Sequence, residues 1–475
     1  MHGSDGVPGA ELVERSAVEQ ARMVRAREVS ARELLDAHLA RVEAVNGTLN
    51  AVVALDPEVG LARAVAVDEA IAAGESPGPL AGLVTAHKDL LETRDFPTTF
   101  GSPVFAGHRP KVDAPLVRRV AEAGAVPIGK TNTPEFGAGS HSFNPVYGVT
   151  RNPYDPSRSA GGSSGGAGVA LRAGMVAVAD GSDFGGSLRN PAGWNNVVGF
   201  RGSARVVPRS GPGNAWNPMP IDGPMARTVD DLVLLLRVLA QPDPADPLHR
   251  PLDIPAVVSP PDRPLRVAWS PTLGGLPVDP DVAAVLDRLR ADLDGLGWEI
   301  EEDEPDFGGA DECFVTLRAF AYSQQGGLLG DRLAEVKATV QDEVSRGLAL
   351  TAGQVSAAYG HLNVLWKRAL AFFDRYDLLI GPVSQVSPFP VEVEYPMEVA
   401  GQAMTSYVEW MRSCCRITAL GSPALSLPAG FTDAGLPVGA QLVGGPWQDL
   451  VVLAAAKAIE AATGHGARAP DLTAL

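Results

Sequence analysis

The first part of the chain has the hydrophobic periodicity of amphipathic helices. Residues 30–33 read Ser-Ala-Arg-Glu, a capping-box pattern in which a serine hydroxyl and a glutamate carboxylate bind backbone N–H groups at the start of a helix. Apolar residues then recur at helical spacing, at Leu34, Leu35, Leu39 and Val42. The pattern predicts a helix that begins after Ser30 and buries one face.

From residue 80 the pattern changes to short apolar runs separated by helix-like segments. Residues 83–86 and 125–128 have the length and composition of buried strands, and residues 115–123 between them have a helical pattern. The alternation returns later, with strand-like runs at 265–269, 378–380 and 424–427 and helix-like runs at 280–293 and 450–462. Strands that alternate with helices are typical of α/β architecture.

Two other stretches stand out in the second half of the chain. Residues 242–264 contain eight prolines, too many for regular structure, so we expect a surface excursion or a linker there. Asp279 and Pro280 follow, a pair typical of the cap and the first position of a helix. Residues 312–376 have a mostly helical pattern.

Charge and composition exclude several functional classes. The chain has 475 residues, with 39 Lys and Arg against 56 Asp and Glu, so its formal net charge is −17. Such a chain does not attract phosphate backbones or anionic lipids, and we expect no nucleic-acid or membrane partner. No apolar run approaches the roughly 18 residues of a membrane span. The start of the chain does not look like a signal peptide, and the cysteines (Cys313, Cys414 and Cys415) do not suggest a disulfide framework. We therefore expect a cytoplasmic protein.

The first glycine-rich motif, residues 124–131, matches the phosphate-loop pattern G-x-x-x-x-G-K-[ST]. A phosphate loop needs a flexible backbone that leads into a helix, whereas Val126, Pro127 and Ile128 occupy this one. We interpret the stretch as a buried strand that ends at Gly129. Nucleotide binding through Lys130 stays open as a function of a different class.

The second motif, residues 161–166, reads Gly-Gly-Ser-Ser-Gly-Gly and contains G-x-S-x-G in two registers, as a hydrolase nucleophile elbow does. An elbow follows a strand, but residues 151–158 before it are polar and broken by prolines. Taken alone, the motif is typical of a flexible loop.

In the third motif, residues 181–192, glycines surround Ser187, so that backbone N–H groups can converge on an anion. A plain turn between strands is the alternative.

Together these motifs resemble the amidase signature family. The resemblance rests on Ala86-His87-Lys88-Asp89, on residues 161–166, on residues 182–192, and on the 24-residue step from Ser163 to Ser187. It covers nearly the whole chain, from about Leu34 through the segments 129–132, 199–211, 421–430 and 435–439. It implies one domain over residues 1–475 with an α/β/α sandwich built around a large mixed sheet.

The resemblance also implies catalytic roles. Members of the family use a Ser-Ser-Lys triad, which here places Lys88 as the base, Ser163 as the bridging serine in a cis peptide and Ser187 as the nucleophile. An alcohol needs a base within hydrogen-bond reach, and a neutral lysine can act in place of histidine. The oxyanion hole would be formed by the backbone N–H groups of Phe184, Gly185, Gly186 and Ser187. Asp183 and Arg189 would brace this loop, without a metal or cofactor.

The implied activity is hydrolysis of a carbon–nitrogen bond in a small-molecule amide, including an aryl amide or a carbamate, through an acyl-enzyme. The alternative within the family is the glutamine-hydrolysing subunit of a tRNA-dependent amidotransferase, which works with partner chains. Asn195-Asn196 stands where many relatives carry Cys-Gly, and Phe184 replaces a commoner, smaller residue. These departures affect the substrate and leave the triad intact.

Candidate specificity residues lie in segments without family motifs. We expect the helical stretch 312–376 to lie on the substrate side of the fold, where it contributes Phe314, Phe320 and Tyr322. The other group is the stretch 407–411. From the aromatic residues Phe184, Trp194, Tyr407 and Trp410 we predict a pocket for aryl or other bulky apolar groups rather than for glutamine. The alternative for these residues is that they pack in the core.

Overall fold

The computed structural model describes residues 9–210 and 215–473. Within these residues, eleven strands form one mixed sheet in the order β1-β3-β2-β6-β8-β7-β14-β15-β11-β9-β10. The strands are β1 Val52–Val53, β2 Val84–Lys88, β3 Val126–Thr131, β6 Val178–Asp183, β7 Val198–Arg201, β8 Ile221–Ala226, β9 Arg266–Trp269, β10 Glu299–Glu302, β11 Leu378–Pro382, β14 Ala424–Phe431 and β15 Pro437–Val443. Two short hairpins lie outside this sheet: β4 Phe143–Asn144 with β5 Gly148–Val149, and β12 Glu398–Val399 with β13 Gln402–Ala403.

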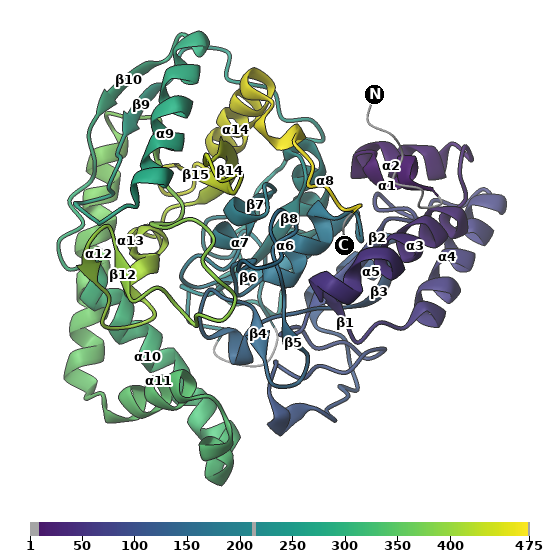
Figure 1. The fold of residues 1–475 in the computed structure, drawn as a ribbon, viewed down its shortest axis with the longest axis horizontal. Coiled ribbons are helices and arrows are strands. Elements are labelled where there is room, and N and C mark those ends of the chain that lie inside the picture. The colour runs from purple at the N-terminus through teal and green to yellow at the C-terminus, as the bar shows by residue number, and fades with distance from the viewer. Residues whose placement is uncertain (1–8, 211–214, 474–475) are drawn as a thin grey trace.

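Helices cover both faces of the sheet (Figure 1). They are α1 Ala10–Glu14, α2 Ala17–Arg25, α3 Ala31–Leu49, α4 Pro57–Ala72, α5 Pro115–Glu122, α6 Gly165–Arg172, α7 Arg189–Trp194, α8 Val229–Leu239, α9 Pro280–Asp292, α10 Ala310–Leu329, α11 Ala338–Ala349, α12 Ala352–Phe373, α13 Arg412–Leu420 and α14 Asp449–Thr463. Short 3₁₀ turns lie at Pro103–Phe105, Glu135–Gly137, Leu293–Leu296, Gly330–Glu335, Glu409–Met411 and His465–Ala467.

The side chains of the strands alternate between two hydrophobic layers. Leu378 and Ile380 of β11 belong to the hydrophobic cluster that includes residues of helices α5, α8, α9 and α14, whereas Leu379 between them belongs to the cluster that includes residues of α10, α12 and α13. Toward β2 and β3, this second face is covered by α3, α4 and α6. Successive residues of a strand point to opposite faces, so a sheet with apolar residues at every position is covered on both sides. The predicted α/β/α sandwich is confirmed.

Local sequence signals account for several element boundaries. The capping box at Ser30 is present, because its hydroxyl accepts from the Glu33 N–H while the Glu33 carboxylate accepts from the Ser30 N–H. Helix α9 begins as predicted, with Asp279 at the N-cap position and Pro280 at its first residue, but the Asp279 carboxylate makes no cap hydrogen bond and accepts from the Ala400 N–H at 2.9 Å instead. Strand β3 continues to Thr131, two residues beyond its predicted end at Gly129.

The two regions singled out in the second half differ in structure. Residues 242–264 contain neither a helix nor a strand. Residues 312–376 lie mostly in α10, α11 and α12, and Figure 1 shows α10 and α11 extending away from the sheet. Among the described residues, no helix has both the length and the hydropathy needed to cross a membrane.

The topology determines where the motifs meet. Strands β2 and β6 are parallel neighbours, paired through Thr85 with Val178 and Ala86 with Ala179. Lys88 is the last residue of β2, and Ser182 and Asp183 end β6. The carboxyl ends of adjacent parallel strands share one edge of a sheet, where the loops that follow them build binding sites. This pair of strands therefore brings the lysine motif to the serine motif.

Candidate active site

Lys88 is fully buried at the end of β2, surrounded by serines. Its Nζ lies 2.8 Å from the Ser163 Oγ, 2.8 Å from the Ser164 Oγ and 3.0 Å from the Ser182 Oγ. The Ser182 carbonyl oxygen lies 3.3 Å from the same nitrogen. The structure thus joins Lys88 to Ser163, as expected. The contacts with Ser164 and Ser182 were not predicted, although both serines lie within the glycine-rich motifs.

The environment of Lys88 favours its neutral form. Burial lowers the pKa of the Lys88 ammonium to about 7, against the opposing attraction of the Asp222, Asp183 and Asp180 carboxylates. Near neutral pH a substantial fraction of this amine is therefore unprotonated. An unprotonated amine 2.8 Å from the Ser163 hydroxyl can accept its proton.

The second glycine-rich motif is a buried loop that leads into α6, and the Gly162–Ser163 peptide bond in it is cis. Its glycines are required by close backbone approaches. A Cβ on Gly165 would lie 2.3 Å from the Ser142 Oγ, and a Cβ on Gly166 would lie 2.3 Å from the Asn132 N. Neither a nucleophile elbow, which follows a strand, nor a flexible loop describes this motif correctly, because the segment before Ser163 is irregular and packed.

The third motif forms a tight loop between β6 and α7. The Asp183 carboxylate accepts from the Gly186 N–H at 2.9 Å and from the Leu188 N–H at 3.2 Å. The Gly186 N–H is therefore committed to Asp183, and its expected place in the oxyanion hole is wrong for this structure. The N–H groups of Phe184, Gly185 and Ser187 are left as the candidate donors. Gly186 has a φ of +113°, and a Cβ there would lie 2.7 Å from the Cys414 Cβ.

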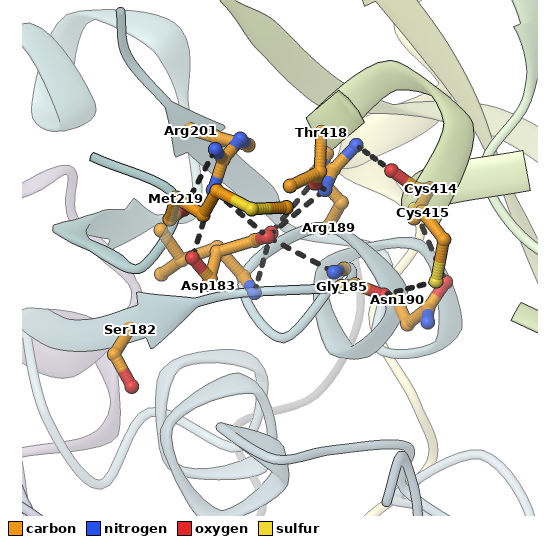
Figure 2. A network of polar contacts seen from close by, with 12 residues as sticks. Ser182, Asp183, Gly185, Arg189, Asn190, Arg201, Met219, Cys414, Cys415 and Thr418 are labelled. Atoms are coloured by element: carbon orange, nitrogen blue, oxygen red, sulfur yellow. Dashed lines mark hydrogen bonds and ion pairs between the residues drawn. The ribbon is translucent and has the colours of Figure 1, made fainter. Parts of the chain in front are cut away.

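A buried network of ion pairs and hydrogen bonds holds the loop through Asp183 (Figure 2). Arg189 binds the Asp183 carboxylate through Nε at 3.0 Å and Nη2 at 2.9 Å, and it also donates to the Gln441 Oε1 at 2.5 Å. Arg201, which sequence reasoning missed, donates to the Asp183 carbonyl oxygen at 2.8 Å. Burial alone would raise the pKa of Asp183. The charges of Arg189 and Arg201 outweigh this effect and hold the pKa well below its usual range.

Asp183→Asn should destabilise the protein severely. The substitution leaves two buried guanidinium groups without their carboxylate, which typically costs about 3–5 kcal/mol. The pKa of Asp183 is depressed in the folded state. The stabilisation that its ionised carboxylate gives the folded protein is therefore complete above the unfolded pKa of about 4 and is lost as the pH falls. Urea unfolding followed by circular dichroism at neutral pH would measure the loss. Asp294→Asn, which breaks an exposed pair with Arg290, is the control and should change stability little.

Ser163 and Ser187 both line a cavity of about 220 Å³. The residues that line it come from both serine motifs, from helix α10 and from the loops between: Leu90, Phe136, Gly137, Ser163, Ser182, Asp183, Phe184, Ser187, Arg209, Ala215, Asn217, Pro220, Arg318, Ala321, Tyr322, Gln324 and Gln325. The predicted helical segment thus forms one wall of the cavity. Arg209, Asn217 and Arg318 were not predicted, because none of them carries a local signal of a cavity; Asn217 and Arg318 also lie outside the family segments, whereas Arg209 lies within segment 199–211.

The aromatic residues expected around the substrate are divided between the cavity and the core. Phe184 and Tyr322 line the cavity. The expectation is wrong for Trp194 and Trp410, whose rings stack on each other at 5.6 Å in the core. It is also wrong for Tyr407, which binds Glu343 and Arg318 behind the cavity wall. Phe314 packs beneath Phe184 with 5.7 Å between ring centroids, and Phe320 of α10 is outside the described lining of this cavity.

A second cavity, of about 490 Å³, adjoins the first, and Leu90, Phe136, Arg209, Gln324 and Gln325 line both. Its walls include an aromatic cluster in which Phe100 contacts Phe105 at 5.3 Å and Phe136 at 6.2 Å between ring centroids. Leu91, Leu116 and Leu328 also line it. Polar residues, among them Glu92, His108 and Asp222, line the rest of this cavity, so its aromatic and leucine part is the portion suited to an apolar group.

The phosphate-loop interpretation of residues 124–131 is wrong. Lys130 lies within strand β3 and is fully buried, with its Nζ 2.5 Å from the Leu91 carbonyl oxygen and 3.0 Å from the Thr98 Oγ1. A Cβ on Gly129 would lie 3.0 Å from the Val53 carbonyl oxygen, so neighbouring backbone closes the space that a phosphate would need. In the described part of the chain, no cluster of three or more His, Cys, Asp or Glu side chains could hold a metal ion.

Known proteins resemble this chain in sequence and in fold. The chain is 35% identical to an acylamidase of Rhodococcus erythropolis over 94% of its own length and 95% of that protein's. It is also 35% identical to one subunit of the glutamyl-tRNA(Gln) amidotransferase of Moorella thermoacetica, covering 97% and 99% of the two chains. The crystal structure of a bacterial aryl acylamidase superposes with a TM-score of 0.90 at 27% identity, covering 97% and 98%. The amidase family model matches residues 33–453, and the chain therefore belongs to the amidase signature family.

Proposed function

We propose that this protein hydrolyses the carbon–nitrogen bond of a small-molecule amide through an acyl-enzyme on Ser187. The observation that carries the proposal is the buried Lys88, whose amine lies 2.8 Å from the Ser163 hydroxyl in the cavity that Ser187 also lines. An amine that is partly unprotonated near neutral pH can serve as a base there. The membership of the chain in the amidase signature family supports the same chemistry.

In the proposed mechanism, the Ser187 hydroxyl attacks the amide carbonyl carbon while its proton passes through Ser163 to Lys88. The oxyanion of the tetrahedral intermediate accepts hydrogen bonds from the backbone N–H groups of Phe184, Gly185 and Ser187. The proton then returns through Ser163 to the leaving nitrogen, and the amine departs. Water, activated by the same relay, hydrolyses the resulting ester and frees Ser187.

The substrate we propose carries an aryl or other bulky apolar group. The aromatic cavity beside the serines supports this choice, since it can enclose such a group while the scissile bond lies at Ser187. A carbamate presents the same carbonyl with an added alkoxy oxygen, so carbamates belong to the proposed scope. The second candidate is hydrolysis of glutamine in complex with partner chains, and it is favoured by the likeness to the amidotransferase protein over 97% of this chain.

The purified chain should hydrolyse an anilide and an aryl carbamate with a higher kcat/KM than glutamine. Phe105→Ala, which shortens the wall of the aromatic cavity, should lower kcat/KM for the two aryl substrates about threefold to tenfold, as expected for one lost aromatic contact. Leu348→Ala, at an exposed position of α11, is the control and should leave all three values unchanged. A clear preference for glutamine would contradict the aryl assignment and support the amidotransferase candidate.

A further inference from the structure

Arg318 presents a charged group to the cavity that contains Ser187. It projects from α10 and is only 4% exposed. Its guanidinium is held by three side chains. Nη2 donates to the Tyr407 hydroxyl at 2.8 Å and to the Tyr322 hydroxyl at 3.3 Å, while Nε lies 3.2 Å from the Tyr407 hydroxyl and 3.4 Å from the Glu343 Oε1. An arginine braced in this way is already ordered before a substrate binds, so little entropy is lost when it makes a further hydrogen bond.

One guanidinium nitrogen is not used by this network. Among residues 9–210 and 215–473, Nη1 of Arg318 has no hydrogen-bond partner, and it does not belong to the buried polar atoms that lack one. Nη1 is therefore accessible. Arg318 lines the cavity of about 220 Å³. A charged N–H donor in a small polar cavity strengthens a hydrogen bond to any acceptor placed there.

The charge of Arg318 is already balanced. Glu343, on α11, is 2% exposed and pairs with the guanidinium, and the Tyr407 hydroxyl donates to the same carboxylate oxygen at 2.7 Å. The other carboxylate oxygen, Oε2, is buried without a partner among the described residues. A substrate carboxylate would place a second anion on one buried guanidinium, which is unfavourable. A neutral oxygen would not add a second anion to this guanidinium.

We propose that Arg318 is a specificity residue that donates, through Nη1, to a neutral ether or carbonyl oxygen of the substrate. Because the cavity is small and also contains Ser187, this oxygen lies within a few bonds of the scissile carbonyl. The inference rests on the proposed function and narrows its substrate class: the preferred amides carry a second oxygen acceptor close to the bond that is cleaved.

Two pairs of isosteric substrates test this assignment. The 4-nitroanilides of butanoic acid and methoxyacetic acid differ by one CH₂-to-oxygen exchange on the acyl side. N-Butylacetamide and N-(2-methoxyethyl)acetamide differ by the same exchange on the amine side. The oxygen also changes the intrinsic reactivity of an amide, so the quantity to compare between variants is the kcat/KM ratio of the oxygen-bearing to the plain substrate. In Arg318→Gln this ratio should fall about tenfold or more in one of the pairs.

Two further variants control this experiment. Arg332→Gln removes an exposed arginine outside the cavity and should leave both ratios at the wild-type value. Arg318→Gln leaves Glu343 buried without its counter-charge and can misfold for that reason. The double variant Arg318→Gln/Glu343→Gln removes both charges and should show the same fall in the ratio. Ratios unchanged from wild type in both pairs, in a folded variant, would overturn the assignment.

The neutrality of the acceptor has its own test. The mono-4-nitroanilide of malonic acid carries a carboxylate near the scissile bond, and the wild-type enzyme should hydrolyse it with a lower kcat/KM than the methoxyacetyl compound. Glu343→Gln frees the charge of Arg318 and should raise kcat/KM for the malonyl compound about tenfold. A wild-type preference for the malonyl compound that is lost in Arg318→Gln would overturn the neutral acceptor.

The outcomes separate this inference from the proposed function. If the wild type hydrolyses no amide, the proposed function fails. If it hydrolyses amides but the kcat/KM ratios are insensitive to Arg318, only this inference fails.

Discussion

Ser187→Ala should abolish amide hydrolysis, lowering kcat by a factor on the order of 10⁶, as found when a catalytic serine is removed from a triad. The methyl group of alanine cannot attack a carbonyl, and the oxyanion donors and the cavity alone support only slow background turnover. The fold should persist, because the substitution removes a single oxygen. Turnover of an anilide and the circular dichroism spectrum of the variant are the measurements. Activity near the wild-type level would exclude Ser187 as the nucleophile.

A serine-directed fluorophosphonate identifies the nucleophile independently. Trypsin cleavage at Arg158, Arg172 and Arg189 places Ser163 and Ser164 in one peptide and Ser182 and Ser187 in the next. We expect the adduct in the second peptide, on Ser187 after fragmentation, and none in Ser187→Ala. An adduct on Ser164 would support the nucleophile-elbow interpretation instead.

Lys88→Arg should be nearly inactive, with kcat/KM lowered about 10²–10⁴-fold, because a guanidinium stays protonated and cannot act as a base. In the wild type, burial lowers the pKa of Lys88 to about 7, and the base is active only when neutral. The kcat/KM should therefore rise with pH through about 7 and level off above it. A pH–rate profile for an anilide measures this directly.

Lys130→Arg is the matched control for Lys88→Arg. Lys130 is equally buried, and burial lowers the pKa of its ammonium to about 8, but its nitrogen binds Leu91, Thr93 and Thr98, none of which lines the cavity that contains Ser187. The folded control variant should keep the wild-type pH profile. Retained activity in Lys88→Arg, or loss of the pH dependence in Lys130→Arg alone, would exclude Lys88 as the base.

Signals within a short stretch of sequence predicted the local structure well. The capping box at Ser30 and the apolar runs of β2, β9 and β11 appear where expected, because a cap or a strand depends on residues close together in the chain. Local sequence did not predict the side-chain partners of Asp279 and Lys130, although the start of α9 and strand β3 lie where it placed them. There the side chains bind partners far away in the sequence, the Ala400 N–H and the Leu91 carbonyl oxygen, which no local pattern contains.

The sequence by itself determined the family and the α/β/α sandwich and singled out Lys88, Ser163 and Ser187 as the candidate catalytic residues, because these depend on motifs that are contiguous and occur in order along the chain. The tertiary structure alone decided how those residues meet and what surrounds them. The pKa of Lys88 follows from its burial among residues of other elements, and the commitment of the Gly186 N–H to Asp183 follows from the shape of one loop. The positions of Arg318, Glu343 and Tyr407 in one network follow from the packing of α10 and α11 against the segment before α13. Such contacts join residues far apart in sequence, so they exist only once the sheet and its two layers of helices have formed.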